Sequence, residues 1–131
     1  MVGILIVSHS KQLALGAKEL AEQMIQADIP LEAVGGTNDG RVGTSSDLIY
    51  NTLDNMEKED GVIIFADMGS AVMNLELAFE LFPEDISSKF VIANAPIVEG
   101  AVSAALEASF DKSLEEIMKV IEEEDFSLKV S

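Results

Sequence analysis

The chain of 131 residues contains no cysteine, and this absence excludes several kinds of chemistry at once. Disulfide bridges, thiolate metal sites and cysteine nucleophiles all depend on that side chain. His9 is the only histidine, which excludes a metal site built from several histidines, and no carboxylate pattern typical of calcium loops is present. We therefore expect no metal site in this chain, and the lack of disulfides favours the cytoplasm as its location.

Basic residues are also scarce. The chain has 8 lysines and arginines against 24 acidic residues, which gives a formal net charge of −16. A surface of this sign repels phosphate backbones and anionic lipids, so we expect neither nucleic acid nor a membrane as a partner. Because Arg41 is the single arginine, any phosphate group that the protein handles is expected to be held mainly by backbone N–H groups.

Long apolar runs are missing, and the short ones alternate with helical patterns. The first run, Val2 to Val7, is too short for a signal-peptide core or a membrane span. Strands are predicted at 2–7, 31–34, 62–66 and 89–94, and helices at 12–27, 44–57, 72–81, 98–108 and 113–123. This alternation predicts one α/β domain over residues 1–131, with an open parallel sheet of order 2-1-3-4 and helices on both faces. The apolar segment 126–130 could add a fifth edge strand, and covering it in a second protomer would give a homodimer.

The histidine lies at the end of the first predicted strand, where Ser8-His9-Ser10 leads into a helix. Open α/β sheets bind ligands beyond the carboxyl ends of their strands, at the point where the strand order reverses. In the order 2-1-3-4 the first and third strands are neighbours, so we expect His9 and Asp67 to flank the same crevice. Without a metal, the roles left for His9 are general base and phosphoryl acceptor.

Asp67 follows the third strand, and it has two possible roles. It can cap the next helix, or it can accept the proton of one His9 ring nitrogen and leave the other free to attack. Small residues then open a helix whose N–H groups and dipole can face an anion. A histidine, a carboxylate and such an anion site together favour phosphoryl transfer over hydrolysis. The predicted phosphoryl-binding residues are Ser10, which can also cap the first helix, and Gly69, Ser70 and Ala71.

A glycine-rich loop follows the second strand. The spacing Gly35-x-x-x-x-Gly40 matches a nucleotide-binding P-loop, but residues 41–42 are Arg-Val where that motif requires Lys-Ser/Thr. A P-loop is therefore excluded. The loop is either plainly flexible or closes over the His9 crevice, in which case the covering residues are Gly36, Thr37 and Thr44.

Four motifs at residues 7–10, 35–45, 67–74 and 95–101 occur in one order over nearly the whole chain. Together they resemble the phosphoryl-donor subunits of the phosphoenolpyruvate-dependent dihydroxyacetone kinases, a family related to the mannose-class IIA domains of the phosphotransferase system (PTS). The resemblance implies that His9 is phosphorylated by the phosphocarrier HPr and that Asp67 is the carboxylate near it. It also implies that enzyme I and HPr are separate proteins here.

The resemblance further implies a phosphotransferase subunit that works through a phosphohistidine. The group would pass to ADP on the nucleotide-binding subunit of the kinase, with the dihydroxyacetone-binding subunit as the other partner. This chain would bind no cofactor, since ADP or ATP and Mg²⁺ would stay on the partner subunit.

Three alternatives stay open. The first is a mannose-class IIA component of a sugar transport system, which shares the chemistry but has a different acceptor. The second is a receiver domain phosphorylated on Asp67, although the first strand lacks the acidic pair that would bind magnesium. The third is a non-catalytic ligand-binding protein, which would leave the pairing of His9 with Asp67 without a purpose.

Overall fold

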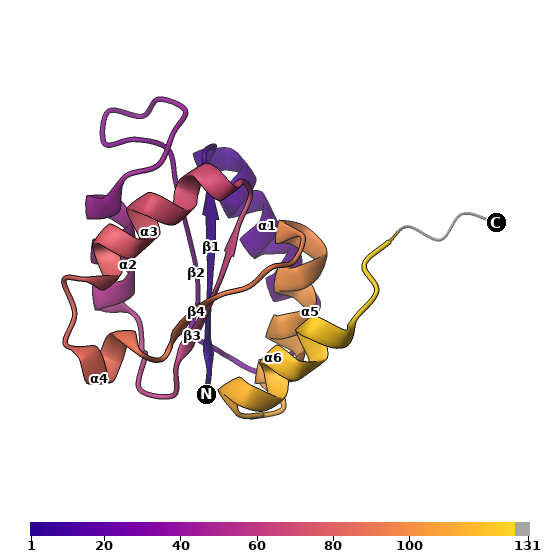
Figure 1. Cartoon of the computed structure of the whole chain (residues 1–131). Coiled ribbons are helices and arrows are strands. Elements are labelled where there is room, and N and C mark those ends of the chain that lie inside the picture. The colour runs from indigo at the N-terminus through magenta and orange to yellow at the C-terminus, as the bar shows by residue number, and fades with distance from the viewer. Residues whose placement is uncertain (128–131) are drawn as a thin grey trace.

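A four-stranded parallel sheet forms the centre of the structure, a computed structural model that describes residues 1–127 (Figure 1). The strands are β1 (Gly3–Ser8), β2 (Leu31–Gly35), β3 (Val62–Ala66) and β4 (Phe90–Ile92). Their order in the sheet is β2-β1-β3-β4, and every neighbouring pair is parallel. The predicted α/β class and strand order are therefore confirmed.

Helices cover both faces of this sheet (Figure 1). On one face lie α1 (Lys11–Gln23), α5 (Ile97–Ser109) and α6 (Leu114–Glu123). On the other lie α2 (Ser46–Asn55), the 3₁₀ turn η1 (Gly69–Ala71), α3 (Val72–Phe79) and the short α4 (Glu84–Ser87). No described helix is both long enough and apolar enough to cross a membrane.

The central strand β1 is buried on both faces, which explains why its sequence does not alternate. Ile4 and Ile6 face the core beneath α1, α5 and α6, whereas Leu5 and Val7 face the core beneath α2 and α3. Every residue of β1 from Gly3 to Ser8 is buried. The strand therefore packs against helices on both faces, and His9 follows directly at its carboxyl end.

The first helix differs from the prediction in where it ends. It ends at Gln23 rather than Ala27, because Ile25 and Ile29 leave the helix and pack against the core. Its buried residues are alanines that lie close to the small residues of α5, whereas the larger apolar side chains are exposed. The exposed ones are Leu13, Leu15 and Leu20, together with Met24 at the C-cap. Only small side chains fit between two helices that approach so closely.

The predicted edge strand at 126–130 is not formed by its described part. Phe126 is half-buried against the core on the α1, α5 and α6 side, and Ser127 is exposed. Residues 128–130 lie outside the described residues. The homodimer that this segment suggested stays a prediction.

The end of β2 approaches the turn after β1 so closely that only glycine fits. A Cβ atom at Gly35 would lie 2.7 Å from the Ser8 carbonyl oxygen and 2.8 Å from the Ser10 carbonyl oxygen. This contact sets the spacing between the glycine-rich loop and the segment that carries His9.

Gly35→Ala is therefore expected to lower the free energy of unfolding by about 1–3 kcal/mol, the usual cost of overpacking. Urea unfolding followed by circular dichroism measures it. The matched control is Gly16→Ala inside α1, where a Cβ meets nothing within 4 Å. That control should stabilise the protein by about 0.5–1 kcal/mol, because alanine is the better helix former. Equal stability of wild type and Gly35→Ala would contradict the close approach.

Candidate active site

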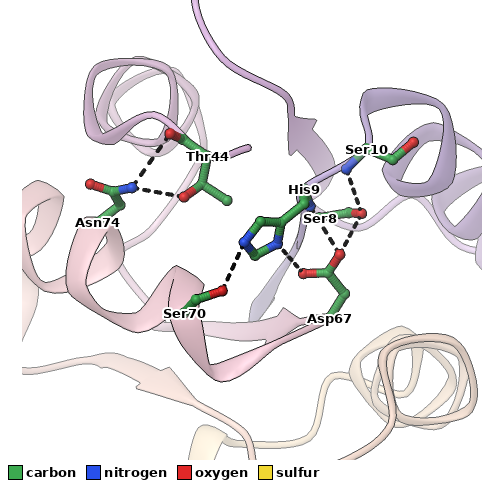
Figure 2. Close-up of polar contacts among 7 residues, drawn as sticks. All are labelled: Ser8, His9, Ser10, Thr44, Asp67, Ser70 and Asn74. Carbon is green, nitrogen blue, oxygen red and sulfur yellow. Dashed lines mark hydrogen bonds and ion pairs between the residues drawn. The ribbon is translucent and has the colours of Figure 1, made fainter. Parts of the chain in front are cut away.

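His9, Asp67 and Ser70 meet where β1 and β3 end (Figure 2). The register pairs Val7 with Ala66, so the residues that follow each strand emerge together. The His9 ring nitrogen Nδ1 lies 2.9 Å from Asp67 Oδ1, and the other ring nitrogen, Nε2, lies 2.9 Å from Ser70 Oγ. The side chains of His9 and Asp67 are 16% and 14% exposed, so their contact is largely shielded from water. The structure thus brings together the two residues expected to share one crevice.

Asp67 accepts three hydrogen bonds, and this fixes its orientation. Its Oδ2 atom accepts from the Ser8 hydroxyl at 2.8 Å and from the His9 backbone N–H at 2.9 Å. Oδ1 is left for the ring. Ser8 is fully buried, and its hydroxyl also accepts from the Ser10 N–H at 3.0 Å. The prediction of site residues omitted Ser8, although a serine that ends a wholly apolar strand was a signal for it.

The hydrogen bonds around Asp67 also determine its charge. Burial alone raises the pKa of the Asp67 carboxyl, but the bonds from the His9 N–H, the His9 ring and the Ser8 hydroxyl outweigh it. The net effect lowers the pKa below its ordinary value. Asp67 is therefore ionised at neutral pH and can only accept hydrogen bonds.

An acceptor at Nδ1 fixes the tautomer of the neutral ring. Because Asp67 has no proton to give, Nδ1 carries the hydrogen, and the lone pair of the ring is at Nε2. The Ser70 hydroxyl then donates to Nε2. Nε2 is consequently the ring atom that can act as a nucleophile, and Ser70 marks the direction from which an electrophile would approach.

The start of the next helix contributes unevenly to an anion site. Gly69 and Ser70 are the first residues of η1, and among the described residues no acceptor binds their backbone N–H groups. The Ala71 N–H donates to the Met68 carbonyl at 3.1 Å, and its side chain is buried in the core. The expectation that Ala71 offers an N–H group is therefore not met by its hydrogen bonding. Gly69 and Ser70 remain available to an anion.

Ser10 and the glycine-rich loop also contact the site differently than predicted. The Ser10 hydroxyl caps α1 by accepting from the Leu13 N–H, as the helix pattern indicated. The Thr37 N–H donates to the Arg41 carbonyl at 2.9 Å, and Gly36 packs beside that same carbonyl, so both make their closest contacts within the loop. The segment that reaches His9 is 43–44, because the Gly43 N–H donates to the His9 carbonyl at 2.9 Å. Of the three predicted covering residues, the structure brings Thr44 to the site.

Possible metal-ligating side chains do not gather in the part of the chain that the structure describes. Within residues 1–127, no group of three or more histidine, aspartate or glutamate side chains is placed to hold an ion. The site itself presents one ring nitrogen with a lone pair, one carboxylate and neutral hydrogen-bond donors.

Comparison with known proteins places this site in a family context. Residues 3–118 match the family model described as PTS system fructose IIA component. The phosphoryl donor subunit of PEP-dependent dihydroxyacetone kinase 2 from Listeria innocua is 34% identical over 119 residues, covering 91% of this chain and 95% of that protein. The phosphotransferase subunit of the PTS-dependent dihydroxyacetone kinase from Lactococcus lactis is 39% identical over 123 residues, covering 91% and 95%.

A solved structure agrees with the fold. The crystal structure of EF1359, a protein of unknown function, superposes with a TM-score of 0.79 at 39% identity, covering 90% of each chain. At this identity and coverage the similarity extends beyond the sheet topology to most of the sequence.

Proposed function

Because the chain belongs to the family of PTS system fructose IIA components, we propose that it carries phosphoryl groups on His9 as the donor subunit of a dihydroxyacetone kinase. HPr supplies the group, and ADP on the nucleotide-binding subunit takes it. The ATP formed there then serves the dihydroxyacetone-binding subunit. Nucleotide and Mg²⁺ stay on the partner subunits, and this chain contributes only its own side chains and backbone.

The observation that carries the proposal is the orientation of the His9 ring. Asp67 holds the proton on Nδ1, so the lone pair at Nε2 faces the side chain of Ser70. Hydrolysis would need a positioned water and a base, whereas phosphoryl transfer needs a nucleophile in line and donors for the oxygens. Nε2 and the start of η1 provide these two elements.

In the first step, the Nε2 lone pair attacks the phosphorus carried by a histidine of HPr. The new N–P bond forms as the N–P bond to HPr breaks, and its electron pair returns to the HPr ring. The His9 ring gains positive charge. Its Nδ1 keeps its proton and continues to donate a hydrogen bond to Asp67, whose negative charge stabilises the charged ring. In the second step, an oxygen of the ADP β-phosphate attacks, and the electron pair of the N–P bond returns to Nε2.

The Ser70 side chain must move away from Nε2 during the first step. Its hydroxyl occupies the approach to Nε2 in the resting protein, and Ser70 is exposed, so the side chain can rotate. After rotation the hydroxyl of Ser70 and the N–H groups of Gly69 and Ser70, which bind no acceptor among the described residues, are available to donate to phosphoryl oxygens. The same residues thus protect the lone pair before transfer and bind the group after it.

The test is to incubate the protein with phosphoenolpyruvate, enzyme I and HPr, and to measure the intact mass. A gain of one phosphoryl group that requires HPr is expected, and addition of the nucleotide-binding subunit with ADP should remove it. Absence of any gain, with HPr itself shown to be phosphorylated, would overturn the proposal. A phosphoprotein that ADP and this subunit cannot discharge would favour a sugar-transport IIA component instead.

A further inference from the structure

The C-terminal end of the glycine-rich loop is held at the site by hydrogen bonds to two different elements. The Gly43 N–H donates to the His9 carbonyl at 2.9 Å. The Nδ2 group of Asn74, the third residue of α3, donates to Thr44 Oγ1 at 2.7 Å and to the Thr44 carbonyl at 3.4 Å. Thr44 and Asn74 are both half-buried. Thr44 is therefore held between the His9 backbone and the helix that follows Ser70.

The bond from Asn74 constrains the hydroxyl proton of Thr44. A hydroxyl has one proton to donate and two lone pairs to accept with. Because the Asn74 amide fills an acceptor position of Oγ1, the Thr44 proton is directed elsewhere, and no described residue accepts it. In Figure 2 the Thr44 side chain lies on the Nε2 side of the His9 ring, the side that Ser70 approaches and Asp67 does not.

The site offers few hydrogen-bond donors for a phosphoryl group, and the Thr44 hydroxyl is one of them. A phosphoryl group brings roughly 1.5–2 negative charges into a protein with a net charge of −16. No lysine or arginine side chain bonds to His9, Asp67 or Ser70 among the described residues. Neutral donors must therefore bind the three phosphoryl oxygens. Ser70 and Thr44 both lie on the Nε2 side of the ring (Figure 2), where such donors are needed.

We propose that the Thr44 hydroxyl donates a hydrogen bond to a phosphoryl oxygen on His9 Nε2, and that Asn74 is the positioning residue that aims it. The proposal rests on the function proposed above. Thr44 keeps its proton throughout, so the balance of the transfer steps is unchanged. Asn74 acts only through Thr44, and substituting it matters only while the Thr44 hydroxyl is present.

The test compares rates of phosphoryl uptake from phosphorylated HPr. Thr44→Val, which removes only the hydroxyl from a similar shape, is expected to slow uptake roughly 10- to 100-fold, as for a lost hydrogen bond to a charged group. Thr44→Ser should recover most of the rate. Asn74→Ala should slow uptake by a smaller factor, and the Thr44→Val/Asn74→Ala double variant should be no slower than Thr44→Val alone.

The matched control is Thr52→Val, which removes a hydroxyl bonded to the Leu48 carbonyl in α2, away from the site. It should leave uptake unchanged, and urea midpoints report whether each variant is folded. Wild-type rates in Thr44→Val would overturn the proposal, as would a Thr44→Ser protein as slow as Thr44→Val. If the double variant took up phosphoryl groups more slowly than Thr44→Val, by the factor seen for Asn74→Ala alone, the role of Asn74 would be overturned.

A second measurement separates this inference from the proposed function. Phosphoramidate phosphorylates histidine side chains chemically and needs no HPr. In protein labelled this way, the ³¹P resonance of the phosphohistidine is expected to move in Thr44→Val and to stay in place in Thr52→Val. A wild type that is labelled only by phosphoramidate would refute the function but leave this comparison valid. An unmoved resonance in Thr44→Val would refute the role of Thr44.

Discussion

His9→Ala protein is expected to take up no phosphoryl group from HPr, whereas the wild type takes up one. The loss is complete rather than partial, because the sequence contains no second imidazole that could replace Nε2. Serine and threonine hydroxyls near the site are weak nucleophiles without an imidazole base beside them, and the substitution removes that imidazole. Intact-mass analysis after incubation with phosphoenolpyruvate, enzyme I and HPr measures the result.

The structure indicates that this variant will fold. Two of the three hydrogen bonds to Asp67 come from the Ser8 hydroxyl and from the backbone N–H of residue 9, and neither uses the ring. Circular dichroism and the urea midpoint serve as controls. The bond type provides a further check, since a phosphohistidine is labile in acid and stable in alkali. An acid-stable, alkali-labile label that persists in His9→Ala would place the group on Asp67 and favour a receiver domain.

The parts of the fold that could be predicted are those in which the local sequence pattern is compatible with only one type of secondary structure. The strand 62–66 is apolar throughout, as expected of a strand buried on both faces, and Asp67 follows directly after it. The helix predicted at 113–123 is α6 in the structure, and it begins with a capping box formed by Ser113 and Glu116. The alternation of such strands and helices predicted the sheet order, and with it the juxtaposition of His9 and Asp67.

The parts that could not be predicted depend on which neighbour occupies a given space. The buried face of α1 consists of alanines because α5 lies close, whereas the helical spacing in α1 alone does not distinguish its alanines from its leucines. The same limit applies to Ala71, whose N–H is taken by Met68 in a 3₁₀ turn that no local pattern predicted. The bond from Asn74 to Thr44 joins residues far apart in the sequence. Such contacts are properties of packing, so periodicity does not reveal them.

Asp67→Asn is expected to have the second-largest effect, because an amide cannot satisfy all the donors that the carboxylate binds. One orientation of the amide keeps its oxygen at Nδ1 but turns its NH₂ group toward the Ser8 hydroxyl and the His9 N–H, so donors face donors. The other orientation keeps the bonds from Ser8 and the backbone and turns the NH₂ group toward Nδ1. That orientation makes Nδ1 an acceptor and moves the ring proton to Nε2.

The stability of this variant relative to wild type should depend on pH. The pKa of Asp67 is lowered in the folded protein, so its ionised form stabilises the fold above the unfolded-state pKa of about 3.9. That contribution is lost as the pH falls through the folded-state value. The stability advantage of wild type over Asp67→Asn should therefore be full at neutral pH and shrink in acid. An advantage that does not change with pH would contradict an ionised Asp67.

The orientation that retains both bonds, from the Ser8 hydroxyl and the His9 N–H, has the lower free energy. It also removes the nucleophilic lone pair from Nε2. With the proton on Nε2, the ring has no lone pair facing Ser70, and phosphoryl uptake from HPr should fall roughly 10²–10⁴-fold. ¹⁵N NMR of the imidazole distinguishes this cause from a general loss of structure, since the protonated nitrogen should change from Nδ1 in wild type to Nε2 in Asp67→Asn. Asp67→Ala is the comparison variant, because it offers no amide to impose the wrong tautomer and should transfer faster than Asp67→Asn if it folds. A folded Asp67→Asn protein with the wild-type rate and the wild-type tautomer would reduce Asp67 to a residue that only orders the turn after β1.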